Sequence, residues 1–162
     1  MSYNIIMLEP IVNKVHKSLI EKNKTVSVAE SCTAGLLSFM LTRFSGSSKY
    51  YSLGIISYSN KAKEDILKIP HSVISKHGAV SQITARRMAQ GVRRIAKTDI
   101  GVGITGIAGP TGATPKKPIG TVFIAINAKK KTICKEFLFS GNRDAIIRKV
   151  TLKALALLQK SI

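Results

Sequence analysis

Ser31 is the residue whose type and setting best suit nucleophilic chemistry. It follows a β-type run that contains Val26 and Val28, and it precedes apolar residues spaced as on one face of a helix. These apolar residues are Leu36, Leu37, Phe39, Met40 and Phe44. At a strand-to-helix turn, backbone N–H groups at the positive end of the helix stabilise a developing oxyanion. Ser31 or Thr33 could instead simply cap the helix, and the turn alone does not separate the two roles.

Tyr58, Lys61 and Lys63 are the groups that could take a proton from Ser31. Lysine normally titrates near pH 10.4, so a lysine base must be desolvated or lie beside other cations. The alternative is that both lysines are exposed residues in the first turn of a helix. Cys32 competes as a nucleophile because a helix N-terminus lowers a thiol pKa. Since no histidine partner is apparent, we interpret Cys32 as a packing residue.

Other site chemistries lack the residues they need. His16, His71 and His77 do not have metal-ligand spacing, and none is placed to complete a Ser-His-Asp triad. The loop at residues 106–117 is not a Walker A motif, because no Gly-Lys-Ser/Thr follows it. We therefore expect neither a metal nor an organic cofactor.

Composition indicates one globular domain over residues 1–162. The 162 residues are 44% apolar, which is enough for a core, and no apolar run approaches the 18 residues that a membrane span needs. The N-terminus shows no signal-peptide pattern, and two cysteines do not make a disulfide framework. We expect a cytoplasmic protein with no membrane partner.

The net charge of +18 raises the possibility of nucleic-acid binding. Nineteen of the 26 basic residues are lysines spread along the chain, and the one dense run, at residues 129–131, resembles a hairpin tip. The chain has no Trp and few aromatic residues, so a stacking platform for bases is not apparent. Attraction of a small phosphorylated substrate explains the charge better, and a nucleic-acid partner is not expected.

The pattern of elements predicts an α/β fold with a mixed sheet. Helices are expected at 10–23, 61–68, 71–77, 83–96 and 143–159, and strands at 25–29, 51–58, 99–105, 120–127 and 132–139. The last two strands resemble an antiparallel hairpin. If the first three are parallel, then Ser31, Tyr58 and Thr105 with Gly106 meet at the carboxyl edge of the sheet, where ligands bind in such folds. The loop that follows Thr105 is rich in glycine and proline, so its backbone can approach a ligand closely.

Six motifs resemble the CinA C-terminal domain family, the nicotinamide-nucleotide amidohydrolases, in order and spacing over about residues 10–160. They are AESCTAG (29–35), YSNKAK (58–63), HGAVS (77–81), TGIAGP (105–110), KPIGTV (117–122) and GNR (141–143). The resemblance implies a three-layer α/β/α sandwich with a largely parallel sheet. It also implies a homo-oligomer, with a dimer as the first expectation. Longer members carry an extra N-terminal domain, and we expect this chain to be the stand-alone form.

The resemblance further implies hydrolysis of the carboxamide of nicotinamide mononucleotide to nicotinate mononucleotide and ammonia. Ser31, Tyr58 and Lys63, rather than Lys61, match the family's catalytic residues. The residues expected to contact substrate are Cys32, Thr33, Thr105, Gly106, Ala108, Gly109 and Arg143, the last as a basic group for the phosphate. The oxyanion would be received by backbone N–H groups at Cys32 and Thr33 or at Gly106.

Two positions depart from the family pattern, and they keep a second function open. Ala34 and Ala113 stand where glycine is common in the family, and either could narrow the pocket. The alternative function is a nucleotide-binding or regulatory module that has kept the pocket and lost the reaction. A nucleic-acid accessory protein is a third hypothesis, which rests on the charge alone.

Overall fold

The computed structural model describes residues 8–128 and 131–162, so two of the three lysines at the expected hairpin tip, Lys129 and Lys130, lie outside the described residues. Five strands form one sheet in the order β2-β1-β3-β4-β5. They are β1 (Val26–Glu30), β2 (Tyr51–Ile56), β3 (Ile100–Gly106), β4 (Thr121–Ala128) and β5 (Lys131–Leu138). β1 pairs in parallel with β2 and β3, whereas β4 pairs antiparallel with β3 and β5. Among the described strands, β4 alone runs against the others, which confirms the mixed, largely parallel sheet.

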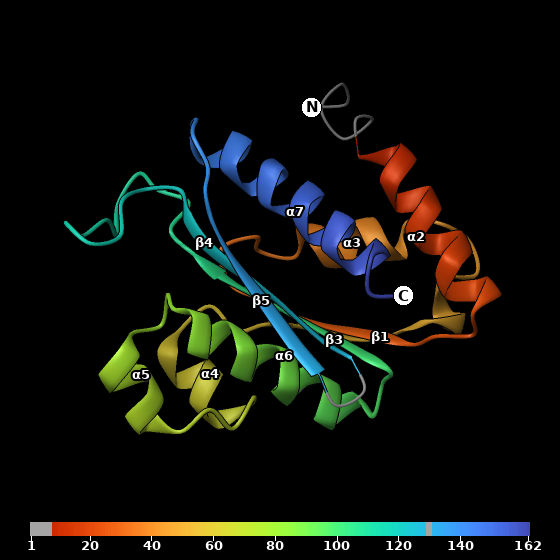
Figure 1. Cartoon of the computed structure of the whole chain (residues 1–162), viewed down its shortest axis with the longest axis horizontal. Coiled ribbons are helices and arrows are strands. Elements are labelled where there is room, and N and C mark those ends of the chain that lie inside the picture. The colour runs from red at the N-terminus through yellow and green to blue at the C-terminus, as the bar shows by residue number, and fades with distance from the viewer. Residues whose placement is uncertain (1–7, 129–130) are drawn as a thin grey trace.

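Helices cover both faces of this sheet, and the three-layer α/β/α arrangement is therefore confirmed (Figure 1). The helices are α2 (Glu9–Glu21), α3 (Leu36–Thr42), α4 (Asn60–Asp65), α5 (His71–His77), α6 (Gln82–Ala96) and α7 (Arg143–Gln159), with a short 3-10 turn η1 (Ser47–Lys49). In Figure 1, α2, α3 and α7 lie on one side of the strands and α4, α5 and α6 on the other. Within the described residues, no helix combines the length and the apolar character that crossing a bilayer requires.

The main core lies between the sheet and α2, α3 and α7. Val28, Val102 and Ile124 from three neighbouring strands are fully buried there, together with Leu19 of α2 and Val150 of α7. Burial of one such aliphatic side chain contributes about 1.5–3 kcal/mol, so this layer supplies most of the stabilising apolar area.

On the other face, α6 approaches β3 unusually closely. A Cβ atom on Gly103 would lie 2.4 Å from the carbonyl oxygen of Ala85, so only glycine fits at that contact. Ala85, Met88 and Val92 are buried on the inner side of α6. Ile95 continues their helical spacing but is exposed, in the last turn before α6 ends at Ala96.

Side-chain caps set the start of three helices. Ser59, Ser81 and Asn142 each accept a hydrogen bond from the backbone N–H three residues later, which satisfies a donor that the helix leaves free. Ser59 and Ser81 lie just before the helices expected at 61–68 and 83–96, and serine is a residue type preferred at helix starts. α5 and α7 have the predicted bounds, and α4 is shorter than its predicted range, ending at Asp65.

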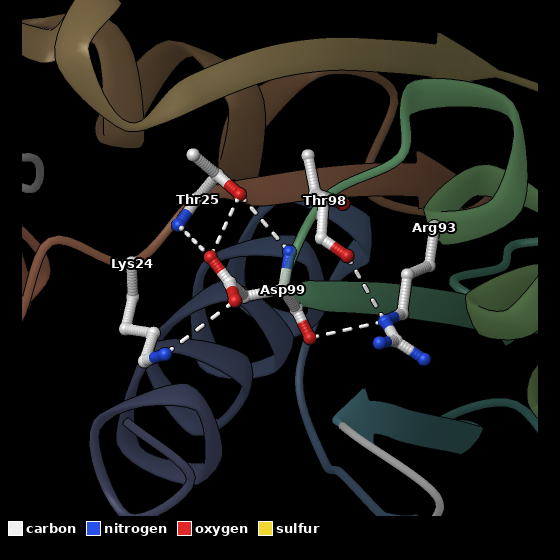
Figure 2. Close-up of polar contacts among 5 residues, drawn as sticks. All are labelled: Lys24, Thr25, Arg93, Thr98 and Asp99. Atoms are coloured by element: carbon white, nitrogen blue, oxygen red, sulfur yellow. Dashed lines mark hydrogen bonds and ion pairs between the residues drawn. The ribbon is translucent and has the colours of Figure 1, made fainter.

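A polar network ties β1 to β3 at the edge of the sheet where these strands begin (Figure 2). The Asp99 carboxylate accepts from the backbone N–H and the hydroxyl of Thr25 at 2.9 and 3.0 Å, and Lys24 approaches it at 3.4 Å. Arg93 donates from Nε to the carbonyl oxygens of Thr98 and Asp99. The Thr25 backbone bond holds the pKa of Asp99 below its usual range. The start of this parallel pair is thus fixed, and the chemistry described next lies at the opposite edge.

Candidate active site

The carboxyl ends of β1, β2 and β3 lie at one edge of the sheet, because the three strands are parallel. A cavity of about 290 Å³ opens there. It is lined by Ser31, Cys32, Tyr58, Asn60, Lys63, Ala79, Val80, Thr105, Gly106, Ile107, Ala108, Gly109, Thr111, Gly112 and Arg143. Of the residues predicted for the site, Thr33 does not line this cavity, whereas all the others do. The predicted convergence of the distant segments is therefore confirmed.

Glu30, not Ser31 or Thr33, caps the helix that follows the nucleophile turn. Residues 31–35 form turns, and α3 begins only at Leu36. The fully buried carboxylate of Glu30 accepts from the backbone N–H groups of Gly35, Leu37 and Ser38 at 3.2, 3.1 and 2.8 Å, and from the Ser38 hydroxyl. The capping interpretation of Ser31 is therefore wrong, because an acidic side chain already satisfies those donors.

This arrangement leaves two backbone donors beside Ser31. Within residues 8–128 and 131–162, no hydrogen bond to another residue uses the N–H of Cys32 or of Thr33. Thr33 itself is buried, and its hydroxyl has no partner among the described residues. Oriented N–H groups next to a nucleophile are what stabilisation of an oxyanion requires.

Lys63 extends from α4 toward Ser31, and both residues line the cavity. Its Nζ atom lies 3.3 Å from Ser31 Oγ and donates to the backbone carbonyl of Ser57 at 2.7 Å. The Lys63 side chain is only 1% exposed, and this burial lowers its pKa from the ordinary lysine value. Lys61, the alternative base, is exposed and forms an ion pair with Asp65 at 2.7 Å. The prediction of Lys63 over Lys61 agrees with this geometry.

Cys32 packs into the main core rather than serving as a second nucleophile. Burial raises the pKa of its thiol to about 12, so the thiolate is scarce at neutral pH. The expected lowering of its pKa by a helix N-terminus does not occur, because α3 begins at Leu36, four residues further on. This supports its interpretation as a packing residue.

Tyr58 and Arg143 meet at the mouth of the cavity. Arg143 donates from Nη2 to the Tyr58 hydroxyl at 2.8 Å and from Nη1 to the carbonyl of Gly109 at 2.6 Å. The bond joins the segment after β2 to the first residue of α7. Tyr58 is 59% exposed, and no hydrogen bond among the described residues joins its hydroxyl to Ser31 or Lys63.

The glycine-rich loop after β3 is fixed at its base and exposed at its tip. Ile107 donates to Thr121 and accepts from Gly120, while Lys117 donates to the carbonyls of His77 and Val80. Residues 110–116, including Ala113, are exposed.

Neither residue that departs from the family pattern narrows the pocket, because Ala34 and Ala113 do not line the cavity. Ala34 instead has a left-handed backbone with φ of +52°, where glycine is favoured.

A larger cavity, of about 480 Å³, lies at the opposite edge of the sheet. Its lining combines apolar side chains such as Ile100 and Ile126 with Lys24, Lys131, Lys160 and Asp99. Among its described lining residues, no hydroxyl is paired with a buried amine, and the Ser161 hydroxyl donates to the Leu157 carbonyl. Chemistry, rather than volume, therefore identifies the smaller cavity as the candidate active site.

Four contributions to the site were not predicted. Ser57 holds Lys63 through its backbone carbonyl, which carries no signal in the sequence. Ala79, Val80 and Asn60 also line the cavity, and their places in the motifs HGAVS and YSNKAK were the available clues.

Fold and site together define a three-layer α/β protein with a hydroxyl–amine pair at the carboxyl edge of its parallel strands. The family model of the CinA C-terminal domain matches residues 8–162. This chain belongs to the CinA C-terminal domain family.

Relatives agree with this assignment in sequence and in structure. A CinA-like protein from Syntrophus aciditrophicus is 46% identical over 153 residues, which cover 94% of this chain and 36% of that protein. The competence damage-inducible protein A from Klebsiella pneumoniae matches with a TM-score of 0.91 at 30% identity, covering 94% of this chain and 95% of that one. A competence/damage inducible protein from Agrobacterium tumefaciens matches with a TM-score of 0.91 at 33% identity, covering 93% of each chain. The chain spans just over a third of the length of the curated relatives that it matches.

Proposed function

We propose that this protein is an amidohydrolase that converts nicotinamide mononucleotide into nicotinate mononucleotide and ammonia. The observation that carries the proposal is the 3.3 Å separation between Ser31 Oγ and the buried Nζ of Lys63. A serine hydroxyl needs an adjacent base to become a nucleophile, and a desolvated lysine is one of the few side chains that can act as that base near neutrality.

The first half-reaction is acyl transfer to the enzyme. Neutral Lys63 takes the proton from Ser31 as Oγ bonds to the carboxamide carbon. The N–H groups of Cys32 and Thr33 receive the oxyanion of the tetrahedral intermediate. Protonated Lys63 then gives its proton to the amide nitrogen, the carbon–nitrogen bond breaks, and ammonia leaves an ester on Ser31.

The second half-reaction regenerates the enzyme. Neutral Lys63 takes a proton from water as the water oxygen bonds to the ester carbon. The bond from that carbon to Oγ then breaks, and Oγ recovers the proton from Lys63. Nicotinate mononucleotide leaves, so that one amide and one water have become one acid and one ammonia.

Two things support a mononucleotide as the substrate: the family resemblance and the groups at the mouth of the cavity. Arg143 supplies a cation there for the phosphate, and the backbone of residues 105–109 can approach the ligand closely. A volume of about 290 Å³ is close to the lower limit for small-molecule sites, which suits a mononucleotide better than a dinucleotide.

The test is an ammonia-release assay with nicotinamide mononucleotide on the wild type, on Ser31→Ala and on Ser48→Ala. Ser48 is an exposed serine outside the cavity and serves as the matched control. We expect Ser31→Ala to lose at least about a thousandfold in kcat while keeping substrate affinity, and Ser48→Ala to match the wild type. Full turnover by Ser31→Ala would exclude the covalent route. Saturable binding without ammonia release by the wild type would instead favour the nucleotide-binding module.

A further inference from the structure

We propose that Thr105 makes the site select a carboxamide over a carboxylate, because its hydroxyl offers only a hydrogen-bond acceptor to the substrate. This inference rests on the proposed function and adds a specificity role for one residue of that site. Three observations lead to it: the pairing of β3 with β1, the hydrogen bond that Thr105 makes, and its burial.

The sheet topology places Thr105 at the same edge as Ser31. β1 and β3 pair in parallel, and the last pair is Ala29 with Gly103. Thr105 lies two residues further on, near the end of β3, and Ser31 lies just beyond the end of β1, so both are at the carboxyl edge of these neighbouring strands. Both residues line the same cavity. A group bonded to an acyl carbon at Ser31 Oγ would therefore lie within reach of Thr105.

The hydroxyl proton of Thr105 is already committed. Thr105 Oγ1 donates to the backbone carbonyl of Ala79 at 2.8 Å, and the Thr105 side chain is only 1% exposed. A threonine hydroxyl has one proton and two acceptor lone pairs. Since its single proton points to Ala79, what remains for a ligand is acceptor capacity.

An acceptor at this position distinguishes the substrate from its product. The amino group of a carboxamide has two N–H donors and can give one of them to Thr105 Oγ1. The carboxylate that hydrolysis creates has only lone pairs, which the Thr105 oxygen repels in a poorly hydrated site. The same bond holds the amide nitrogen in the cavity with Lys63, the group proposed to protonate it. Thr105 thus favours binding of the amide and release of the acid.

The test is the ratio of two dissociation constants, measured by calorimetry in a Ser31→Ala background so that no turnover occurs. The ligands are nicotinamide mononucleotide and nicotinate mononucleotide. We expect the background protein to prefer the amide, and Thr105→Val to reduce this preference about tenfold, as loss of one hydrogen bond in a buried site predicts. Thr105→Ser keeps the hydroxyl and should keep the preference.

Thr84→Val is the matched control for stability. Thr84 Oγ1 donates to the carbonyl of Gly78 at 2.7 Å, so this variant also removes a hydroxyl that anchors residues 78–81, but Thr84 does not line the cavity. It should bind both ligands with an unchanged ratio. If Thr105→Val folds poorly, Thr105→Ala provides the same comparison.

An unchanged amide-to-acid ratio in Thr105→Val, even with both ligands bound more weakly, would overturn the proposal, because that result describes a purely structural residue. A preference of the background protein for the acid would also overturn it. Failure of the proposed function is seen separately, as an absence of ammonia release by the wild type.

Discussion

The backbone carbonyl of Ser57 holds the amine of Lys63 at 2.7 Å. Ser57 in turn donates its N–H at 2.9 Å to the carbonyl of Glu30, the residue before Ser31. Two backbone groups therefore connect the proposed base to the strand that carries the proposed nucleophile. Because a backbone carbonyl fixes the amine, its position depends on the β1–β2 pairing and not on a mobile side chain.

Lys63 makes activity dependent on pH. Burial lowers its pKa, so the neutral base becomes populated below the ordinary lysine range. We expect kcat to rise with pH through this lowered pKa. Lys63→Arg should be inactive at every pH tested, because a guanidinium stays protonated. A flat pH–rate profile in the wild type would contradict this assignment.

The same lowered pKa makes stability dependent on pH. In the unfolded chain Lys63 titrates near 10.4, so between its lowered folded pKa and about 10.4 the unfolded state binds more protons. Folding stability should therefore rise with pH in that window and level off above it. Lys63→Met should lose this rise, whereas Lys76→Met, a change at an exposed residue, should keep it. Urea unfolding at several pH values measures the effect, and parallel curves for wild type and Lys63→Met would refute it.

Tyr58 should act through Arg143 rather than by moving the proton. Its hydroxyl accepts from Arg143 at 2.8 Å, and Lys63 already reaches Ser31 directly. We expect Tyr58→Phe and Arg143→Ala each to raise KM roughly tenfold with a small change in kcat. The double variant should be little worse than Arg143→Ala alone, because Tyr58 is expected to act only through its contact with Arg143. A fall in kcat of about a hundredfold or more for Tyr58→Phe, with KM unchanged, would instead identify a proton relay.

Glu30 should be one of the most costly residues to truncate. Glu30→Ala leaves three backbone N–H groups of the nucleophile turn and α3 without an acceptor, and it should lower the free energy of unfolding by about 3 kcal/mol. Glu30→Gln keeps the shape and should cost about half as much. Glu64→Ala breaks only a surface pair with His71 and should cost less than about 0.5 kcal/mol. Equal urea midpoints for Glu30→Ala and Glu64→Ala would contradict this role.

Periodicity and breaker residues were enough to predict the order of helices and strands and an α/β fold with a mixed sheet, whereas the three-layer arrangement was expected from the family resemblance. The three β-type runs that each precede a polar turn are parallel, and the helices that begin at Ser81 and Asn142 lie where capping chemistry indicates. Phe39 illustrates the limit of this reasoning. It was grouped with Leu36 and Met40 on one apolar helix face but is 53% exposed, because the face of α3 that packs inward carries Leu37, Met40 and Leu41.

At the site, the reactive side chains could be predicted from the sequence. The roles of backbone groups, and contacts in which a side chain folds back onto its own turn, could not. Ser31 and Lys63 were recognisable by residue type and motif, and the structure brings them together. No local pattern reveals that the Glu30 carboxylate bends over its own turn to reach Ser38, since a cap normally lies much closer to the helix that it begins. Ser57 acts through a carbonyl that every residue possesses, so its type carried no signal.

The exposed loop after β3 lies apart, along the chain, from the proposed proton-transfer pair. Ser31, Ser57 and Lys63 all come from the first 63 residues, while the exposed segment 110–116 is tethered by contacts on either side of it. Insertions or replacements at that outer tip would reshape the entrance and leave the proton-transfer pair undisturbed. Related sequences could in this way diverge toward different ligands through one short surface segment, with the Ser31–Lys63 pair retained beneath it.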